Sequence, residues 1–234
     1  MIHQFPSIRL LLALLLLGMG IAQPCLAQEE DEIQVQFVCF PPSPGNNKAE
    51  LVTGDGKVIE VELPSNALSE VYTMVKPAQW VLGRRVVDEE GNPSFEVHGK
   101  VGALAAKRQI VLVTRKGVKN EDGLVMNPFA ADSDGLGGGK YLFFNAAKVD
   151  LACELGSLQF KLLPGQHRLL APDPSEMKND RGYLYTRMYF RKGKEAKAFY
   201  ESTWRYNKKA KSLVFIYHDE HTLQLRTHSI RSFR

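Results

Sequence analysis

The segment His218–His221, HDEH, holds the residue types that most resemble a set of metal ligands. A zinc site needs three or four converging ligands, and side chains three residues apart share a face only on a helix. The flanking residues alternate as in two β-strands, which predicts a polar hairpin turn at this segment. Nothing in the sequence brings His167 or His228 to that turn. We therefore expect neither a metal site nor a cofactor here.

Two further segments resemble parts of ion-binding loops. Asp132–Gly135 resembles the start of a calcium loop, but Gly137–Gly139 follow in place of the further oxygen ligands and closing glutamate. Lys140 follows these glycines as in a phosphate loop. There, however, Asp134 stands where the first glycine is needed and Tyr141 replaces the serine or threonine. Neither pattern is complete, so neither predicts a site.

The sequence names no catalytic residue. It contains no G-x-S-x-G element, which would place a serine nucleophile on a sharp turn. A hydrolase-type enzyme would need a site assembled from scattered residues, such as His98, His167 or His218 with acidic neighbours. The sequence favours a non-catalytic protein and leaves this enzyme as the alternative.

Aromatic residues gather near the C-terminus among lysines and arginines, a mixture that can stack on sugars or bases. They are Tyr183, Tyr185, Tyr189, Phe190, Phe199, Tyr200, Trp204, Tyr206, Phe215 and Tyr217. Core packing explains alternating aromatic residues in strands more often. The chain carries a formal net charge of +4, and its basic residues concentrate after Met177. These features are compatible with an anionic polysaccharide as partner, and an envelope protein is the other partner that we expect; nucleic acid is not expected.

The N-terminus has the layout of a secretory signal peptide. Arg9 precedes an apolar run from Leu10 to Leu17, and Cys25 and Ala27 occupy the −3 and −1 positions. We expect a signal peptide over residues 1–27 and export to the periplasm or the extracellular space. The apolar run is shorter than the about 20 residues of a membrane span, and no later segment is long enough to form one.

Cys39 and Cys153 remain after that cleavage. Alternation places each of them on an apolar strand face, and an oxidising compartment favours pairing. A disulfide between them would close a long loop and contribute about 4 kcal/mol in the chain-entropy model. The alternative is two buried thiols that act as small hydrophobic side chains.

The remaining chain predicts many short strands and little helix after the signal peptide. The expected strands are 33–40, 49–53, 57–63, 79–87, 94–101, 109–115, four within Lys140–Pro172, 183–191, 194–206, 213–218 and 223–231. Ala67–Val71 could form one helical turn, and Val118–Gly139 reads as a long loop, a kind of segment that is often functional. No internal sequence repeat is visible.

This pattern predicts an all-β, predominantly antiparallel, two-sheet immunoglobulin-like β-sandwich in one domain, residues 28–234. The alternative is two small sandwiches divided within residues 118–139.

The C-terminal half resembles a family of exported bacterial β-sandwich proteins without an assigned function, and loosely the periplasmic accessory proteins of alginate acetylation. The matching segments are Gly138–Asn145, Val149, Leu151, Leu163–Gly165, Ser202–Tyr206, Leu213–Tyr217, Asp219, Leu225–Arg226 and Ser229–Arg231. The resemblance covers roughly residue 109 to the end and implies an all-β domain without an activity. From export, composition and this resemblance we expect a non-catalytic, envelope-associated binding or accessory module, with a structural envelope component as a further alternative.

Overall fold

The computed structural model describes residues 32–41, 47–115, 123–132, 135–177, 182–192, 195–219 and 222–233. The expected signal peptide lies outside these residues. The described residues form sixteen strands and one 3-10 turn at Pro174–Glu176. The prediction of an all-β sandwich with predominantly antiparallel pairing is confirmed. None of the helical structure in these ranges is long and apolar enough to cross a membrane.

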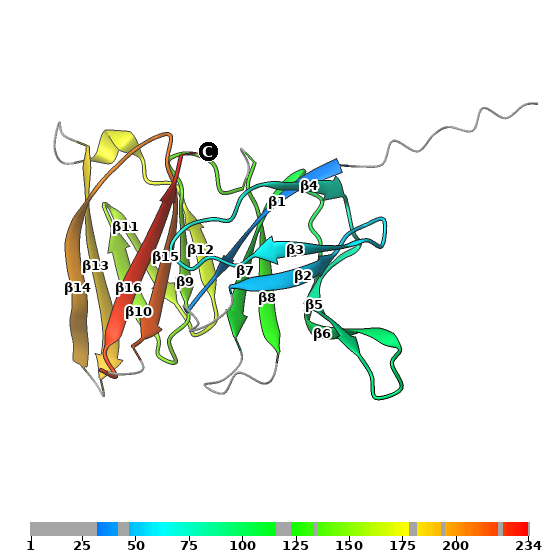
Figure 1. Ribbon diagram of the computed structural model, residues 1–234. Helices are drawn as coiled ribbons and strands as arrows, with labels where there is room; N and C mark the ends of the chain where they lie inside the picture. Colours follow the sequence, from blue (N-terminus) through cyan, green and yellow to red (C-terminus); the bar gives the residue numbers. More distant parts are fainter. Residues whose placement is uncertain are drawn as a thin grey trace, which may run out of the picture. The chain divides into compact units, whose positions relative to one another are not determined.

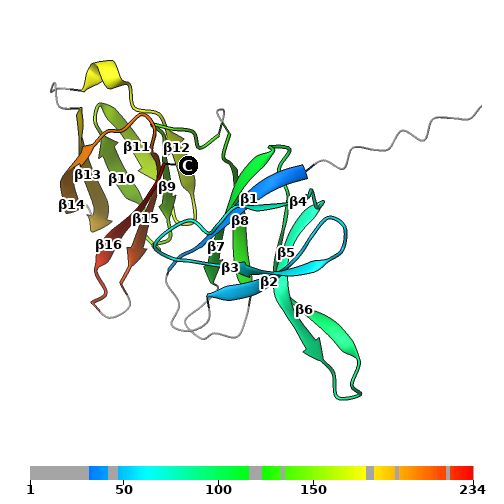
Figure 2. The same ribbon diagram turned by 45° about the horizontal axis from the view of Figure 1, so that its top comes forward.

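The first eight strands form two four-stranded sheets (Figure 1). Sheet A contains, in spatial order, β4 (Tyr72–Val75), β1 (Glu32–Cys39), β7 (Arg108–Arg115) and β8 (Leu124–Ala130). Sheet B contains β3 (Val58–Glu62), β2 (Lys48–Val52), β5 (Gln79–Val87) and β6 (Pro93–Gly102). Figure 2 shows the β5–β6 hairpin extending beyond β2, which pairs with only part of β5.

The last eight strands form two further sheets. Sheet C contains β12 (His167–Leu170), β9 (Tyr141–Asn145), β15 (Lys211–His218) and β16 (Leu225–Ser232). Sheet D contains β11 (Leu158–Leu162), β10 (Leu151–Leu155), β13 (Tyr183–Lys192) and β14 (Glu195–Arg205). In the described residues no strand of one half pairs with a strand of the other, so the strands are divided among four sheets where the sequence had suggested two.

The two halves repeat one topology, because each strand of the first half corresponds to the strand eight places later. The parallel pair β1–β7 corresponds to the parallel pair β9–β15, and every other pair is antiparallel in both halves. Even a register irregularity recurs. It falls between Leu82 and Gly83 in β5 and between Met188 and Tyr189 in β13. The repeat is not visible in the sequence because the two halves share their topology while their residues differ.

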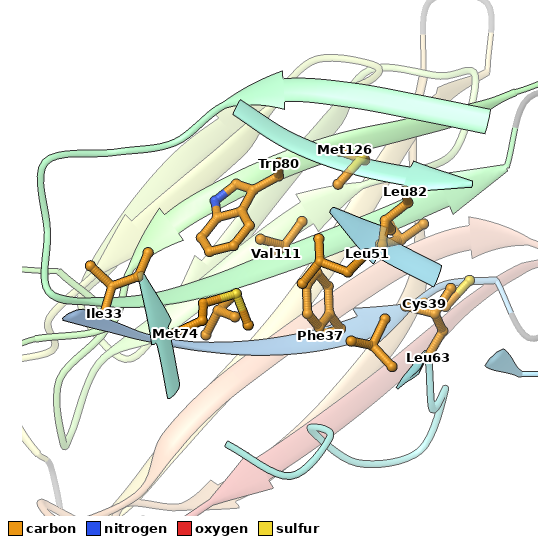
Figure 3. Close-up of a cluster of buried hydrophobic side chains, with 13 residues drawn as sticks. Ile33, Phe37, Cys39, Leu51, Leu63, Met74, Trp80, Leu82, Val111 and Met126 are labelled. Atoms are coloured by element: carbon orange, nitrogen blue, oxygen red, sulfur yellow. The ribbon is translucent and has the colours of Figure 1, made fainter. Parts of the chain in front are cut away.

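Each half has its own core between its two sheets. In the first half Phe37, Trp80, Leu82 and Val111 point toward one another, as Figure 3 shows. In the second half Phe143, Leu155, Met188 and Val214 belong to the corresponding cluster between sheets C and D. Both cores follow from the two-residue period of strands, which sends alternate side chains to one face.

A third cluster joins sheets A and C. Val38 and Phe40 come from the β1 segment, Ile110 and Leu112 from β7, and Phe215 from β15. These residues lie between neighbours in sequence that face the sandwich cores, so the strands are buried on both sides. Strands buried on both faces have nearly continuous apolar sequences. This explains the runs Gln109–Val113 in β7 and Leu213–Ile216 in β15. The clusters therefore link the halves, although the halves share no sheet.

Two local expectations were wrong. The expected loop Val118–Gly139 contains strand β8, which the pattern missed because Pro128 interrupts it. Proline lacks an N–H donor and is tolerated on an edge strand, and β8 is an edge of sheet A. Residues 67–71 form no helical turn, and strand β4 follows them.

No disulfide joins Cys39 and Cys153, and the alternative of two buried thiols holds in this structure. Cys39 packs in the core of the first half, whereas Cys153 packs in the core of the second half. The sequence correctly placed both side chains on apolar faces. Alternation along a strand reports the face but does not report which core that face covers.

Candidate functional site

The outer face of sheet D carries the polar and aromatic side chains that make the candidate site. Alternate residues along β10 and β13 point to opposite faces of sheet D. Cys153 and Leu155 of β10 and Met188 of β13 are buried on the inner face, whereas Ala152 is exposed on the outer face. Tyr189 stands on the same outer face as Ala152, and the two residues are direct cross-strand partners. Side chains on this face therefore meet as neighbours across the strands.

A pocket of about 580 Å³ lies on this face. Its lining includes Ala152, Glu154, Gln159, Lys161, Arg168 and Tyr189. Lys161 is the partner of Ala152 on β11, so one row across the sheet runs Lys161, Ala152, Tyr189. The methyl group of Ala152 leaves space between the tyrosine ring and the lysine. Arg168, from the neighbouring sheet C, adds a second cation to the same pocket.

The tyrosine that borders the pocket is held by a network of side chains on β13 and β14. The Arg187 guanidinium donates a hydrogen bond to the Tyr189 hydroxyl at 3.0 Å and lies 5.9 Å from its ring centroid. The same guanidinium stacks over Tyr185 at 4.9 Å and pairs with Glu201 at 3.1 Å. These contacts orient the ring of Tyr189 before any ligand arrives.

The network fixes protonation as well as geometry. Hydrogen bonds from Tyr185 and then Arg187 lower the pKa of Glu201, which therefore stays ionised. The hydrogen bond to Glu201 raises the pKa of Tyr185, so its phenol stays protonated. Near neutral pH the charge of Arg187 is balanced by Glu201, and the cations that face the pocket are Lys161 and Arg168.

The equivalent face of the first half shows what is special about this pocket. By strand register Gly83, Glu50 and Glu60 occupy the positions of Tyr189, Ala152 and Lys161. There the charges are paired internally: Arg85 Nε lies 2.6 Å from Glu50, and Lys48 lies 2.5 Å from Glu60. Within the described residues neither Lys161 nor Arg168 has such an ion pair. The pocket of the second half therefore holds two cations and the carboxylate of Glu154, a net positive charge, whereas the corresponding charges of the first half form ion pairs.

A second pocket of about 750 Å³ adjoins the first. It shares Lys161 and Arg168 with the first pocket and adds Leu163, Gln166 and His167 from the β11–β12 turn and the start of β12. Asn127 of β8 also lines it, so both halves of the chain contribute.

The histidines that the sequence singled out do not assemble into one site. His98 lies on β6 in sheet B, 3.7 Å from Glu96. His167 packs edge-on against Phe129 at 4.8 Å, and His218 ends β15. Over the described ranges no group of three histidine, cysteine, aspartate or glutamate side chains could hold a metal ion. Glu220 and His221 lie outside those ranges.

The loop that resembled ion-binding motifs is partly described. The Asp132 carboxylate accepts a hydrogen bond from the Gly135 amide at 3.0 Å, and Lys140 Nζ donates to the Gly135 carbonyl at 2.9 Å. Both side chains thus stabilise the turn around Gly135. Residues 116–122 and 133–134 lie outside the described part of the chain.

Sequence reasoning found Tyr189 among the C-terminal aromatic residues but missed its neighbours. Lys161 and Arg168 stand in the short strands that read as framework, and Ala152 carries no chemical signal at all. Most of the aromatic residues do pack inward; Trp204 and Phe215 are buried. The available signal was a lysine beside an alanine on an exposed strand face, but only the strand register shows that the two residues are neighbours.

Comparison of the chain with models of known protein families gives no match, and comparison with curated proteins gives none either. The resemblance of the C-terminal half to exported bacterial β-sandwich proteins therefore stays a prediction.

Proposed function

We propose that the protein is a non-catalytic binding module for an anionic polysaccharide, which it holds on the outer face of sheet D. The observation that carries the proposal is the row Lys161, Ala152, Tyr189 with Arg168 beside it. It combines an oriented aromatic ring, an adjoining slot and two cations that form no ion pair among the described residues, beside the carboxylate of Glu154.

Each part of the pocket matches one part of an acidic sugar. The apolar face of a sugar ring packs against an aromatic side chain, here Tyr189, as apolar surface does elsewhere. A sugar carboxylate is attracted by the ammonium of Lys161 and can accept paired hydrogen bonds from Arg168. Glu154 and Gln159, which face each other across β10 and β11, supply acceptors and a donor for hydroxyl groups.

The expected affinity of this single pocket is low. Exposed ion pairs contribute about 0.2–1 kcal/mol each, and the pocket is open to solvent. A weak site suits a polymer, which presents the same acidic sugar many times. The proposed location in the cell envelope, the periplasm or extracellular space, rests on the expected signal peptide.

The test is titration calorimetry of the purified protein with tetragalacturonate as a uronate probe and maltotetraose as a neutral probe. We expect binding of the uronate that weakens when sodium chloride is raised, because salt screens exposed charges. The double variant Lys161→Gln, Arg168→Gln should bind about tenfold more weakly, the equivalent of about 1.4 kcal/mol.

Lys208→Gln is the matched control. Lys208 lines a separate basic pocket with Arg205 and Arg231, and this pocket shares no lining residue with the pocket beside Ala152. We expect it to leave uronate binding unchanged. Equal loss in Lys208→Gln would show a general attraction to basic surface, and equal binding of maltotetraose would remove the acidic sugar from the proposal.

A further inference from the structure

We infer that the second pocket continues the first, so that the ligand is a linear chain of acidic sugars that spans both. This inference rests on the proposed function and adds the length and path of the ligand. Its starting observation is that Lys161 and Arg168 line both pockets. Two separate small-molecule sites would each need their own charged groups, whereas a continuous chain can share them.

The size of the pockets agrees with a chain. Pockets for small molecules measure about 300–1,000 Å³. The two pockets here measure about 580 and about 750 Å³, so each falls within that range by itself. Together they accommodate a ligand larger than one sugar residue.

The second pocket is built on a fixed turn. The Gly165 amide donates to the Asn145 carbonyl at 2.8 Å, and the Asn145 amide donates to the Gln166 carbonyl at 2.9 Å. Asn145 is fully buried, and its side chain donates to the carbonyl of Leu162 at 3.0 Å. Gly165 has a φ of 73°, a conformation that glycine adopts without strain. A turn pinned in this way presents its polar groups with little ordering cost on binding.

The groups of the second pocket suit sugar hydroxyls and carboxylates. Asn127 and Gln166 carry amides, which donate and accept hydrogen bonds, and His167 carries an imidazole. The ring of His167 is oriented by its edge-on contact with Phe129 at 4.8 Å. The half-exposed Leu163 adds apolar surface.

Asn127 also explains why the first half matters for binding. It belongs to β8 of sheet A, whereas all other residues that line the two pockets come from the second half. The first half thus contributes to the path of the chain, although its own outer face has neutralised charges.

The test compares digalacturonate with hexagalacturonate by titration calorimetry. We expect the hexamer to bind the unmodified protein more than tenfold tighter than the dimer, because one chain then contacts both pockets. Asn127→Asp keeps the size of the side chain and adds a negative charge to the second pocket. It should weaken the hexamer about fivefold and leave the dimer unchanged.

Gln159→Glu is the control, since it adds the same charge to the first pocket only. It should weaken the dimer and the hexamer alike. Equal affinity for dimer and hexamer, or a hexamer that is insensitive to Asn127→Asp, would overturn the continuous path while leaving the proposed function intact. If neither probe binds, both the continuous path and the proposed function are overturned.

Discussion

Tyr189 stands directly opposite Ala152 across β13 and β10, and Lys161 stands directly opposite Ala152 on its other side. The alanine is therefore the floor between an aromatic ring and a cation. In the first half the same three positions hold glycine and two glutamates. One small residue at the centre of the row creates the space that the proposed ligand needs.

Filling that space should weaken binding without unfolding the protein. We expect Ala152→Leu to weaken uronate binding at least tenfold, because the larger side chain occupies the slot beside Tyr189. Ala152 is exposed, so the free energy of unfolding should change by less than about 0.5 kcal/mol. Titration calorimetry and urea unfolding measure the two quantities.

Ala198→Leu is the matched control for this substitution. Ala198 is also a direct partner of Tyr189 and is also exposed, but it does not line the pocket, which on β14 is lined by Ala196. Binding should stay close to that of the unmodified protein. Equal loss of binding in both variants would place the ligand on the wrong side of Tyr189.

The buried Gln109 should prove indispensable to the first half. Its Oε1 accepts a hydrogen bond from Trp80 Nε1 at 3.0 Å, and its Nε2 donates to the carbonyls of Leu104 and Ala106 at 3.0 Å. Gln109→Ala leaves these buried groups without a partner and should cost about 3 kcal/mol. Urea unfolding provides the measurement. Gln79→Ala, at an exposed position of β5, should change stability by less than about 0.5 kcal/mol.

The two halves should unfold together because they share a core. Phe40 stacks on Phe215 with ring centroids 4.7 Å apart and an angle of 11° between the planes. Phe215→Ala should cost about 3–5 kcal/mol and lower the urea midpoint by on the order of 1 M. In a Trp204→Phe background the fluorescence of Trp80 reports on the first half alone.

We expect the midpoint seen by Trp80 to fall together with the midpoint seen by circular dichroism. An unchanged Trp80 transition in Phe215→Ala would mean that the halves unfold independently. Limited proteolysis is a second check: two stable fragments of similar size would favour two separate sandwich domains over one.

The Cys153 thiol should resist reagents in the native protein. Burial raises its pKa to about 12 from an ordinary value of 9.0, so the thiol stays protonated at pH 8. Because the native pKa is raised, its contribution to stability is complete below pH 9 and is lost as the pH rises toward 12. Cys153→Ala should flatten the stability curve in that window.

Thiol labelling also tests the cysteine arrangement. In a Cys25→Ala chain we expect almost no reaction with a chromogenic disulfide reagent under native conditions at pH 8. Two thiols should react after unfolding in urea, because Cys39 and Cys153 belong to different cores. A chain that releases no thiol after unfolding would contain the disulfide that the structure lacks.

The strands were predictable where one face of the sheet is exposed to solvent. Gln79–Val87 and the β13–β14 hairpin were expected almost to the residue, since alternation and turn glycines or charged residues mark them. Strand β8 was missed because Pro128 interrupts its pattern, and β4 was missed because four residues carry too little periodicity. Short or interrupted strands gain their identity from the partner strand to which they pair.

The amino-acid sequence by itself determined the β class and the face on which most side chains lie, because a strand sends alternate residues to opposite sides. It also placed Cys39 and Cys153 on apolar faces, where both side chains are buried. Only the tertiary structure decided which faces meet. The doubled topology, the core shared through Phe40 and Phe215, and the row Lys161, Ala152, Tyr189 all depend on strand register and sheet packing. These pairings join residues far apart in the chain, and local periodicity contains no information about such partners.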